Sequence, residues 1–65
     1  MKATIIYINN GIHNINRVES CKTKSEVFDD FGESHPVKVK VTGYNWPCVY
    51  IVRGNEENGT AIAFN

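Results

Sequence analysis

Apolar and polar residues alternate most clearly over Val37–Thr42, where valines occupy every second position and Lys38 and Lys40 stand between them. Successive side chains of a β-strand point to opposite faces, so this pattern predicts a strand with one apolar face and one basic face. Two further segments, Lys2–Ile8 and Cys48–Arg53, are apolar at consecutive positions and rich in β-branched and aromatic residues. They predict strands that are buried on both faces.

Two Asn-Gly pairs lie beside apolar segments. Asn10-Gly11 follows the first strand, and Asn58-Gly59 precedes the last apolar segment, Thr60–Phe64. Asparagine and glycine adopt positive φ at low cost, and the tight turns of β-hairpins require that conformation. Each pair therefore predicts a hairpin turn.

The segment Ile12–Cys21 has an ambiguous period, because Ile12, Ile15, Val18 and Cys21 recur every three residues. This spacing fits neither strict strand alternation nor a straight helix. A strand with one β-bulge would bring these side chains to a common face, since a bulge adds one residue and shifts the alternation. We predict a bulged strand, because asparagine and β-branched residues are poor helix formers, and a helix is the alternative.

A short helix is predicted over Thr23–Gly32. Thr23 and Glu26 have the spacing of a capping box, and Gly32 provides a C-terminal stop. Two helical turns are not stable alone, so the apolar side chains of this helix must pack on the sheet. Those side chains are Val27, Phe28 and Phe31.

The predicted elements follow the order ββαβββ, so residues 1–65 are expected to form one α+β domain. Its architecture is a small antiparallel sheet of about five strands with one short helix packed on it, the last three strands forming a meander. One short helix covers only part of one face of a sheet, whereas two strands are apolar on both faces. The remaining apolar face must be covered by closure into a small β-barrel, which is the alternative fold, or by another chain.

Length and charge exclude several classes of function. The chain has 65 residues and a formal net charge of zero. A domain this small buries only about 60% of its unfolded surface and has little room for a deep pocket, so we expect no enzyme activity. The chain lacks the overall basic excess that is typical of nucleic-acid-binding proteins. Its apolar runs, such as Ile5–Ile8, are far too short to cross a membrane, and no export signal is recognisable, so a cytoplasmic location is expected.

The residues with metal-binding or nucleophilic chemistry are dispersed. No two of Cys21, Cys48, His13 and His35 lie within four residues of each other, whereas zinc ligands usually occur in close pairs. We therefore predict no metal site, no catalytic site and no cofactor. In the cytosol both cysteines are expected to be free thiols, with a Cys21–Cys48 disulfide as the alternative.

The candidate binding residues are Tyr44 and Trp46, in a loop after the alternating strand, together with Lys38, Lys40 and Arg53. Tryptophan and tyrosine are enriched at the centres of protein interfaces, and they also stack on nucleic-acid bases while lysines contact phosphates. Two other interpretations remain open. Trp46 would fold back over the small core, and the lysines would protect an exposed strand edge from pairing with other chains.

These observations favour a non-catalytic protein–protein interaction module, such as a small regulator or inhibitor of a larger bacterial or phage-related machine. Its expected partner is another protein or a second copy of the chain. A first alternative is a nucleic-acid-binding small β-barrel that uses Tyr44, Trp46, Lys38 and Lys40. A second is a structural subunit whose sheet is completed in a homo-oligomer.

Overall fold

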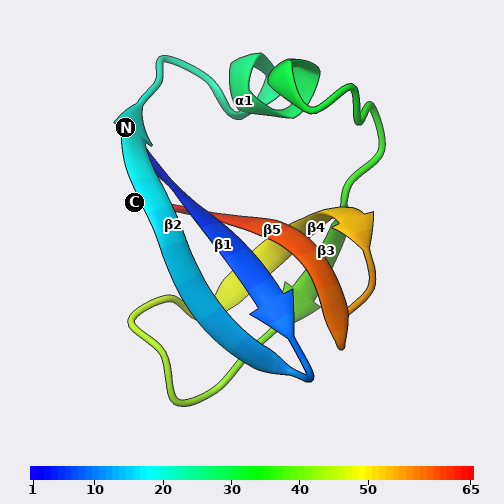
Figure 1. The fold of residues 1–65 in the computed structure, drawn as a ribbon. Coiled ribbons are helices and arrows are strands. Elements are labelled where there is room, and N and C mark those ends of the chain that lie inside the picture. The colour runs from blue at the N-terminus through cyan, green and yellow to red at the C-terminus, as the bar shows by residue number, and fades with distance from the viewer.

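The computed structural model describes residues 1–65 and contains a single five-stranded antiparallel sheet with one short helix. The elements in chain order are β1 (Lys2–Asn9), β2 (Ile12–Ser20), α1 (Lys24–Asp30), β3 (Val37–Lys40), β4 (Cys48–Gly54) and β5 (Asn58–Phe64). The strands lie side by side in the order β2-β1-β5-β4-β3 (Figure 1). The predicted order ββαβββ is therefore confirmed. Strands β2 and β3 are the two edges and do not pair with each other, so the sheet is open and is not a closed barrel.

Two apolar cores lie on opposite faces of the sheet. The helix-side core contains Ala3, Ile5, Cys21, Val27, Val52 and Ile62, and α1 covers it (Figure 1). The loop-side core contains Ile6, Ile8, Trp46, Val49, Ile51, Ala61 and Ala63. Strands β1 and β4 contribute side chains to both cores, which confirms that these two strands are buried on both faces.

The loop-side core is covered by the chain that joins β3 to β4. Trp46 of this loop is only 8% exposed, and Val39 and Val41 pack against the same core. The second apolar face thus needs no barrel closure, because a loop of irregular structure buries it.

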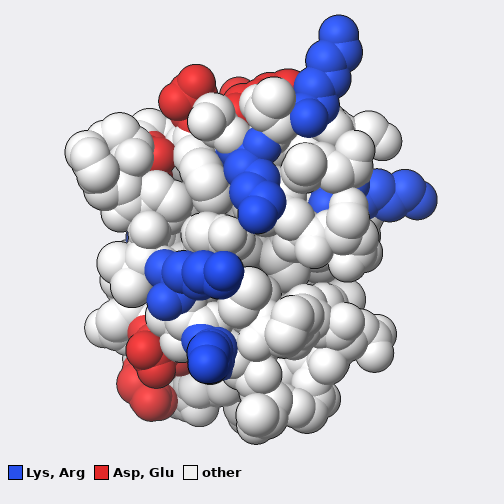
Figure 2. Space-filling model, turned by 180° about the vertical axis from the view of Figure 1, so that it is seen from behind, with Lys and Arg blue, Asp and Glu red and all other residues white.

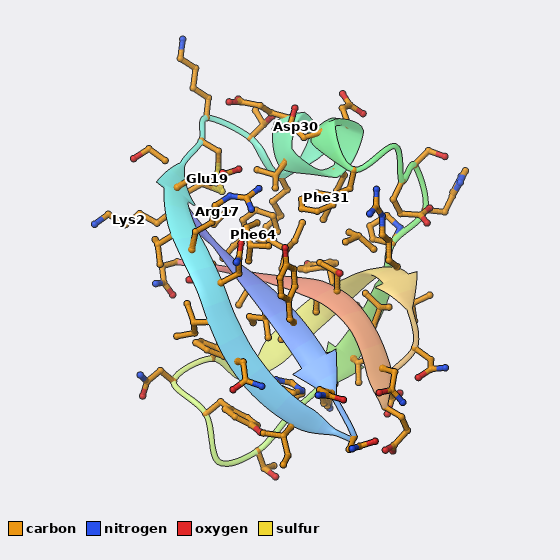
Figure 3. The ribbon with its side chains drawn as sticks, viewed as in Figure 1. Lys2, Arg17, Glu19, Asp30, Phe31 and Phe64 are labelled. Carbon is orange, nitrogen blue, oxygen red and sulfur yellow. The ribbon has the colours of Figure 1, made fainter.

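The helix begins and ends where the sequence predicts. Thr23 is the N-cap, and its hydroxyl oxygen accepts a hydrogen bond of 3.3 Å from the backbone N–H of Glu26. The Glu26 carboxylate accepts from the backbone N–H of Lys22 at 3.2 Å, one residue earlier than in a standard capping box. Phe31 of the C-cap and Phe64 of β5 both pack against the helix-side core, and Figure 3 shows them between α1 and the sheet.

Strand β2 is a bulged strand, as predicted. Its pairing with β1 shifts by one residue midway along, and Asn16 is the extra residue. Because paired residues share a face, Ile15 and Val18 lie on the loop side of the sheet, whereas Ile12 lies on the helix side. The expected common face therefore holds for only two of the four side chains, since Cys21 belongs to the helix-side core. Ile12, Ile15 and Val18 are more than half exposed.

The two predicted hairpin turns differ in outcome. Asn10 and Gly11 join β1 to β2 with φ values of 52° and 78°, so the first prediction is confirmed. Asn58 and Gly59 instead begin β5, and the turn occupies residues 55–57. The side-chain oxygen of Asn55 accepts the backbone N–H groups of Glu57 and Asn58, both at 2.9 Å, and so organises this turn.

The role of Gly59 is close backbone packing within the sheet. A Cβ atom at this position would overlap the carbonyl oxygen of Arg53 in the neighbouring strand. A glycine in a strand can mark a bulge or a close backbone approach as well as a turn. The local sequence does not distinguish these cases, because the approach depends on which strand lies alongside.

Strand β3 is shorter than predicted and ends at Lys40. Its valines point to the loop side, but Val37 remains 62% exposed because it lies at the sheet edge. Cys21 and Cys48 are free thiols, of which Cys21 is buried in the helix-side core. The one helix has seven residues, and no helix of the chain is long and apolar enough to span a membrane.

Candidate functional site

The structure divides the five candidate binding residues between the two faces of the sheet. Trp46 belongs to the loop-side core, and Tyr44 stacks on it. Lys38, Lys40 and Arg53 lie on the helix side, because they pair with residues whose side chains point there. Lys38 and Arg53 are therefore separated from the two aromatic residues, whereas Lys40, at the end of β3, lines one cavity together with Tyr44. The five side chains do not make one continuous site.

The loop that contains Tyr44 and Trp46 reaches across to the first residues of β2. The Tyr44 ring is 5.8 Å from the Trp46 ring and 4.4 Å from the His13 ring, and both pairs are nearly parallel. The Tyr44 hydroxyl also accepts a hydrogen bond of 3.4 Å from the backbone N–H of His13. This stack attaches the loop to the edge of the sheet.

Two nitrogen atoms in this stack are buried without a hydrogen-bond partner: Nδ1 of His13 and Nε1 of Trp46. Partial burial lowers the pKa of His13 below its usual value of 6.5, since desolvation disfavours the charged ring. His13 is accordingly neutral at pH 7. A neutral imidazole has one nitrogen that accepts a hydrogen bond, so this residue is a polar group with unused capacity.

The helix side of β3 and β4 presents a basic and aromatic surface. Lys24 Nζ lies 5.3 Å from the Tyr50 ring centroid and donates to the Tyr50 hydroxyl at 3.3 Å. Lys38 Nζ lies 5.9 Å from the same centroid. Figure 2 shows lysine and arginine side chains over the middle of the molecule seen from behind and at its upper right, with acidic groups at the top and at the lower left. None of these lysines is in an ion pair, since the only ion pair joins Arg17 and Glu19.

Strand β2 is a long edge with apolar side chains at its surface. It has nine residues, and its side chains Ile15 and Val18 are 57% and 54% exposed on the same face. After the bond from His13 to Tyr44, no hydrogen bond joins the outer side of the strand to another segment. The backbone of this edge is therefore available to pair with another strand.

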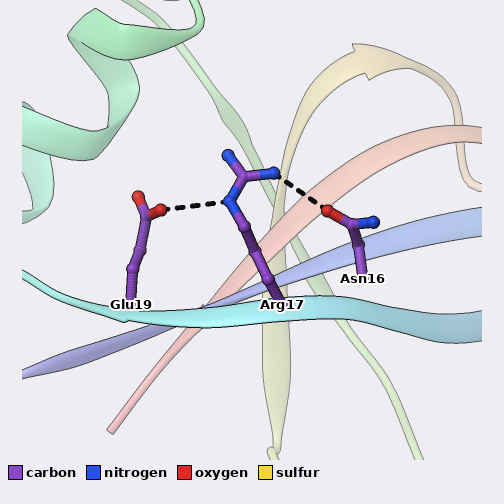
Figure 4. A network of polar contacts seen from close by, with 3 residues as sticks. All are labelled: Asn16, Arg17 and Glu19. Carbon is purple, nitrogen blue, oxygen red and sulfur yellow. Dashed lines mark hydrogen bonds and ion pairs between the residues drawn. The ribbon is translucent and has the colours of Figure 1, made fainter.

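Apart from Ile12 at its start, the helix-side face of β2 is polar. Figure 4 shows that Arg17 Nε donates to Glu19 at 3.1 Å, and that Arg17 Nη1 donates to the side chain of Asn16 at 2.9 Å. Figure 3 shows Arg17 and Glu19 on the side of the strand that faces α1. Ile15 and Val18 are thus on the face opposite to these charged side chains.

The residues of this edge were not among the predicted site residues. His13 is expected from the sequence to be an ordinary surface histidine, and Ile15 and Val18 are expected to contribute to a common apolar face. The relevant signal in the sequence was the three-residue spacing of apolar side chains in this segment, and this spacing predicted the bulge. Whether such a strand lies at the edge or in the middle of a sheet depends on the strand order, which a local pattern does not contain.

No group of three or more histidine, cysteine, aspartate or glutamate side chains is placed to hold a metal ion. The unusual features are therefore the exposed edge of β2, the aromatic stack beside it and the basic surface around Tyr50. Comparison with protein-family models, with curated proteins and with solved structures finds no match for this chain.

Proposed function

We infer that this chain is a non-catalytic protein-binding module that accepts an extended segment of a partner protein along the outer edge of β2. The observation that supports this function is the combination of an unbonded edge backbone with Ile15 and Val18, both more than half exposed. An added strand would satisfy the free backbone groups, and alternate side chains of the partner would cover the two aliphatic residues.

The two components of this interface have different roles. Backbone hydrogen bonds give affinity without demanding a particular partner sequence, whereas contacts with Ile15 and Val18 select apolar side chains at matching positions. Fully burying an aliphatic side chain contributes about 1.5–3 kcal/mol, so covering the remaining half of these two is worth about 2 kcal/mol together. A chain that occupies a partner's strand in this way acts by blocking or holding it, which is the action of a small regulator or inhibitor.

The test is a comparison of two edge variants in capture of a partner from the native host and in binding of the purified partner. In Ile15→Lys/Val18→Lys, charged side chains replace the apolar pair on β2. In Val37→Lys, the same change is made on β3, at a valine that is 62% exposed. Thermal unfolding of both variants checks that each one folds.

The β2 variant should bind the partner at least about 30-fold more weakly, because a loss of about 2 kcal/mol corresponds to that ratio. The Val37→Lys variant should bind within about twofold of the parent protein, because β3 lies outside the proposed interface. Equal loss in both variants, or loss in Val37→Lys alone, would contradict the proposal. If the captured partner is a second copy of the chain, the structural-subunit alternative replaces it, and sedimentation of the parent protein would show the same dimer.

A second candidate function is binding to a single-stranded nucleic acid on the basic surface. It is favoured by Lys24 and Lys38, which lie over the Tyr50 ring without any acidic partner. Such a site predicts affinity that falls steeply as salt is raised, and a Lys38→Glu/Lys40→Glu variant should abolish it. Absence of binding to single-stranded DNA and RNA at low salt would eliminate this candidate.

A further inference from the structure

A cavity of about 280 Å³ lies on the loop side of the sheet, near the end at which β1 turns into β2. Its apolar walls include Ile8, Val49 and Val41, and its polar walls include His13, Glu56 and Glu57. This volume is close to the lower limit of about 300 Å³ for small-molecule sites. It suits one side chain or one small organic molecule and is too small for a large cofactor.

The acidic groups of the cavity are unneutralised. Glu56 and Glu57 belong to the turn between β4 and β5, both are exposed, and neither is in an ion pair. The Glu57 carboxylate lies against Gly11, since one of its oxygens is 3.3 Å from the position that a Cβ atom of Gly11 would occupy. The backbone N–H of Gly11 also donates to the Glu57 carbonyl at 2.8 Å, which holds the two turns together beside the cavity.

The cavity wall also includes the ring of His13. The Nδ1 atom of His13 is buried with no hydrogen bond. Lys40 is the only basic residue of the lining, so one positive charge stands against the two glutamates. With Glu56, Glu57 and Lys40 in the lining, its net formal charge is still negative, beside an apolar wall and a neutral histidine ring.

We propose that this cavity binds an organic cation with a short aliphatic stem, such as the guanidinium or ammonium group of an arginine-like or lysine-like molecule. The stem packs against the valine and isoleucine side chains, and the cationic head lies between the two glutamates and His13. This arrangement matches the chemistry of long basic side chains, which bury their methylene groups and keep the charged end in a polar environment. The proposal is independent of strand addition at β2.

The experiment is a titration of the isotope-labelled protein with n-butylguanidinium, followed through its backbone amide signals. The expected result is saturable shifts at His13, Tyr44 and Val49, which surround the cavity. The neutral isostere n-butylurea should bind at least about tenfold more weakly, since a hydrogen bond to a charged group contributes more than that ratio. Equal affinity for the urea, or no saturation by the cation, would overturn the proposal.

Two double variants separate a specific site from general attraction between charges. Glu56→Gln/Glu57→Gln should weaken binding of n-butylguanidinium at least about tenfold. Asp29→Asn/Asp30→Asn removes the same formal charge from two exposed positions on α1, outside the cavity lining, and should change the affinity by less than about twofold. An equal decrease in both variants would show attraction to net charge only and would overturn the proposal.

The source of the cation is distinguished by a second ligand, a blocked Ala-Arg-Ala tripeptide. Tighter binding of the tripeptide than of n-butylguanidinium identifies a protein side chain as the natural occupant. Binding of n-butylguanidinium with exclusion of the tripeptide identifies a free small molecule. Both results support the cationic site, and the strand-binding proposal can fail without affecting either of them.

Discussion

The two edges of the sheet are protected to very different degrees. Strand β3 has four residues, follows Pro36 and presents Lys38 and Lys40 on one face. Strand β2 has nine residues and presents Ile15 and Val18 at its surface. Natural sheets usually protect an edge with short length, charged side chains, proline or a bulge. Strand β3 combines short length, two lysines and a preceding proline, whereas β2 is long and has a bulge and the charged pair Arg17 and Glu19 on its helix-side face.

The difference indicates that the exposure of β2 is not a general property of so small a sheet. The protecting features of β3 occur in the same chain, so a sheet of this size can carry them, yet β2 lacks most of them. The loop that begins after β3 also reaches the start of β2, where the Tyr44 hydroxyl binds the backbone of His13. Only the remainder of the β2 edge is left without partners, and that remainder contains two of the three exposed aliphatic residues of the strand, Ile15 and Val18.

The largest effect is expected from Trp46→Ala, which tests whether the loop between the edges is part of the core. Removing a buried aromatic side chain typically costs about 3–5 kcal/mol, and Trp46 is only 8% exposed. Urea unfolding should show a loss of this size, which would unfold a large fraction of so small a domain. Asn45→Ala, an exposed position in the same loop, is the control and should change the stability by less than about 0.5 kcal/mol.

Retained stability in Trp46→Ala would contradict the core assignment and would restore Trp46 as a surface residue available to a partner. The two interpretations that the sequence left open for this residue are therefore separated by one measurement of folding.

The second prediction removes the protection from β3. In Lys38→Val/Lys40→Val the strand becomes apolar on both faces, so pairing between copies of the chain should increase. Sedimentation should show dimers or larger species at concentrations where the parent protein shows fewer. Lys2→Val/Lys22→Val removes two charges at exposed positions outside β3 and should leave the distribution unchanged. Equal association of both variants would mean that positive charge alone, rather than lysines at the sheet edge, prevents copies of the parent protein from associating.

Much of the fold follows from local sequence. The Lys/Val alternation, the Asn10-Gly11 turn, the Thr23 cap and the bulged strand all depend on residues close together in the chain, and each is found in the structure. The prediction of a turn at Asn58-Gly59 was wrong, because Gly59 lies within a strand, where the close backbone of the neighbouring strand leaves no room for a Cβ atom. That requirement is set by pairing between segments, which a local pattern does not specify.

The candidate site was less accessible from the sequence for the same reason. Proximity in the chain suggested that Lys38 lies near the loop of Tyr44 and Trp46, but strand pairing places Lys38 on the helix side and the loop on the other face. His13 and Tyr44 are distant in the sequence and stack at 4.4 Å. Such contacts follow from the strand order β2-β1-β5-β4-β3, in which the loop after one edge crosses to the opposite edge.

A smaller effect is expected from pH, because the contact between the loop and β2 contains a histidine. Burial lowers the pKa of His13 in the folded protein below the usual value of 6.5. At a pH between the folded-state pKa and 6.5, the unfolded chain therefore binds more protons than the folded protein. Stability should therefore decrease as the pH falls from about 6.5 towards the lower, folded-state pKa. Urea unfolding at a series of pH values measures this slope. His13→Phe should reduce the dependence of the free energy of unfolding on pH, whereas His35→Asn, at an exposed position, should leave it unchanged. The reverse pattern would exclude His13 as the source of this dependence.

The smallest effect is expected from Tyr44→Phe, which keeps the aromatic stack and removes only the hydroxyl that accepts the His13 N–H. This hydrogen bond is long at 3.4 Å and exposed, so the loss of stability should be about 0.5 kcal/mol, at the low end for a single bond. The informative measurement is hydrogen exchange, because the His13 amide should exchange faster while amides in the middle of β1 remain unchanged. Faster exchange would also extend the unbonded edge of β2 by one residue, so a strand-adding partner should bind this variant at least as tightly as the parent protein. Weaker binding would mean that the partner contacts the Tyr44 hydroxyl itself, and the interface would then include the loop as well as the edge.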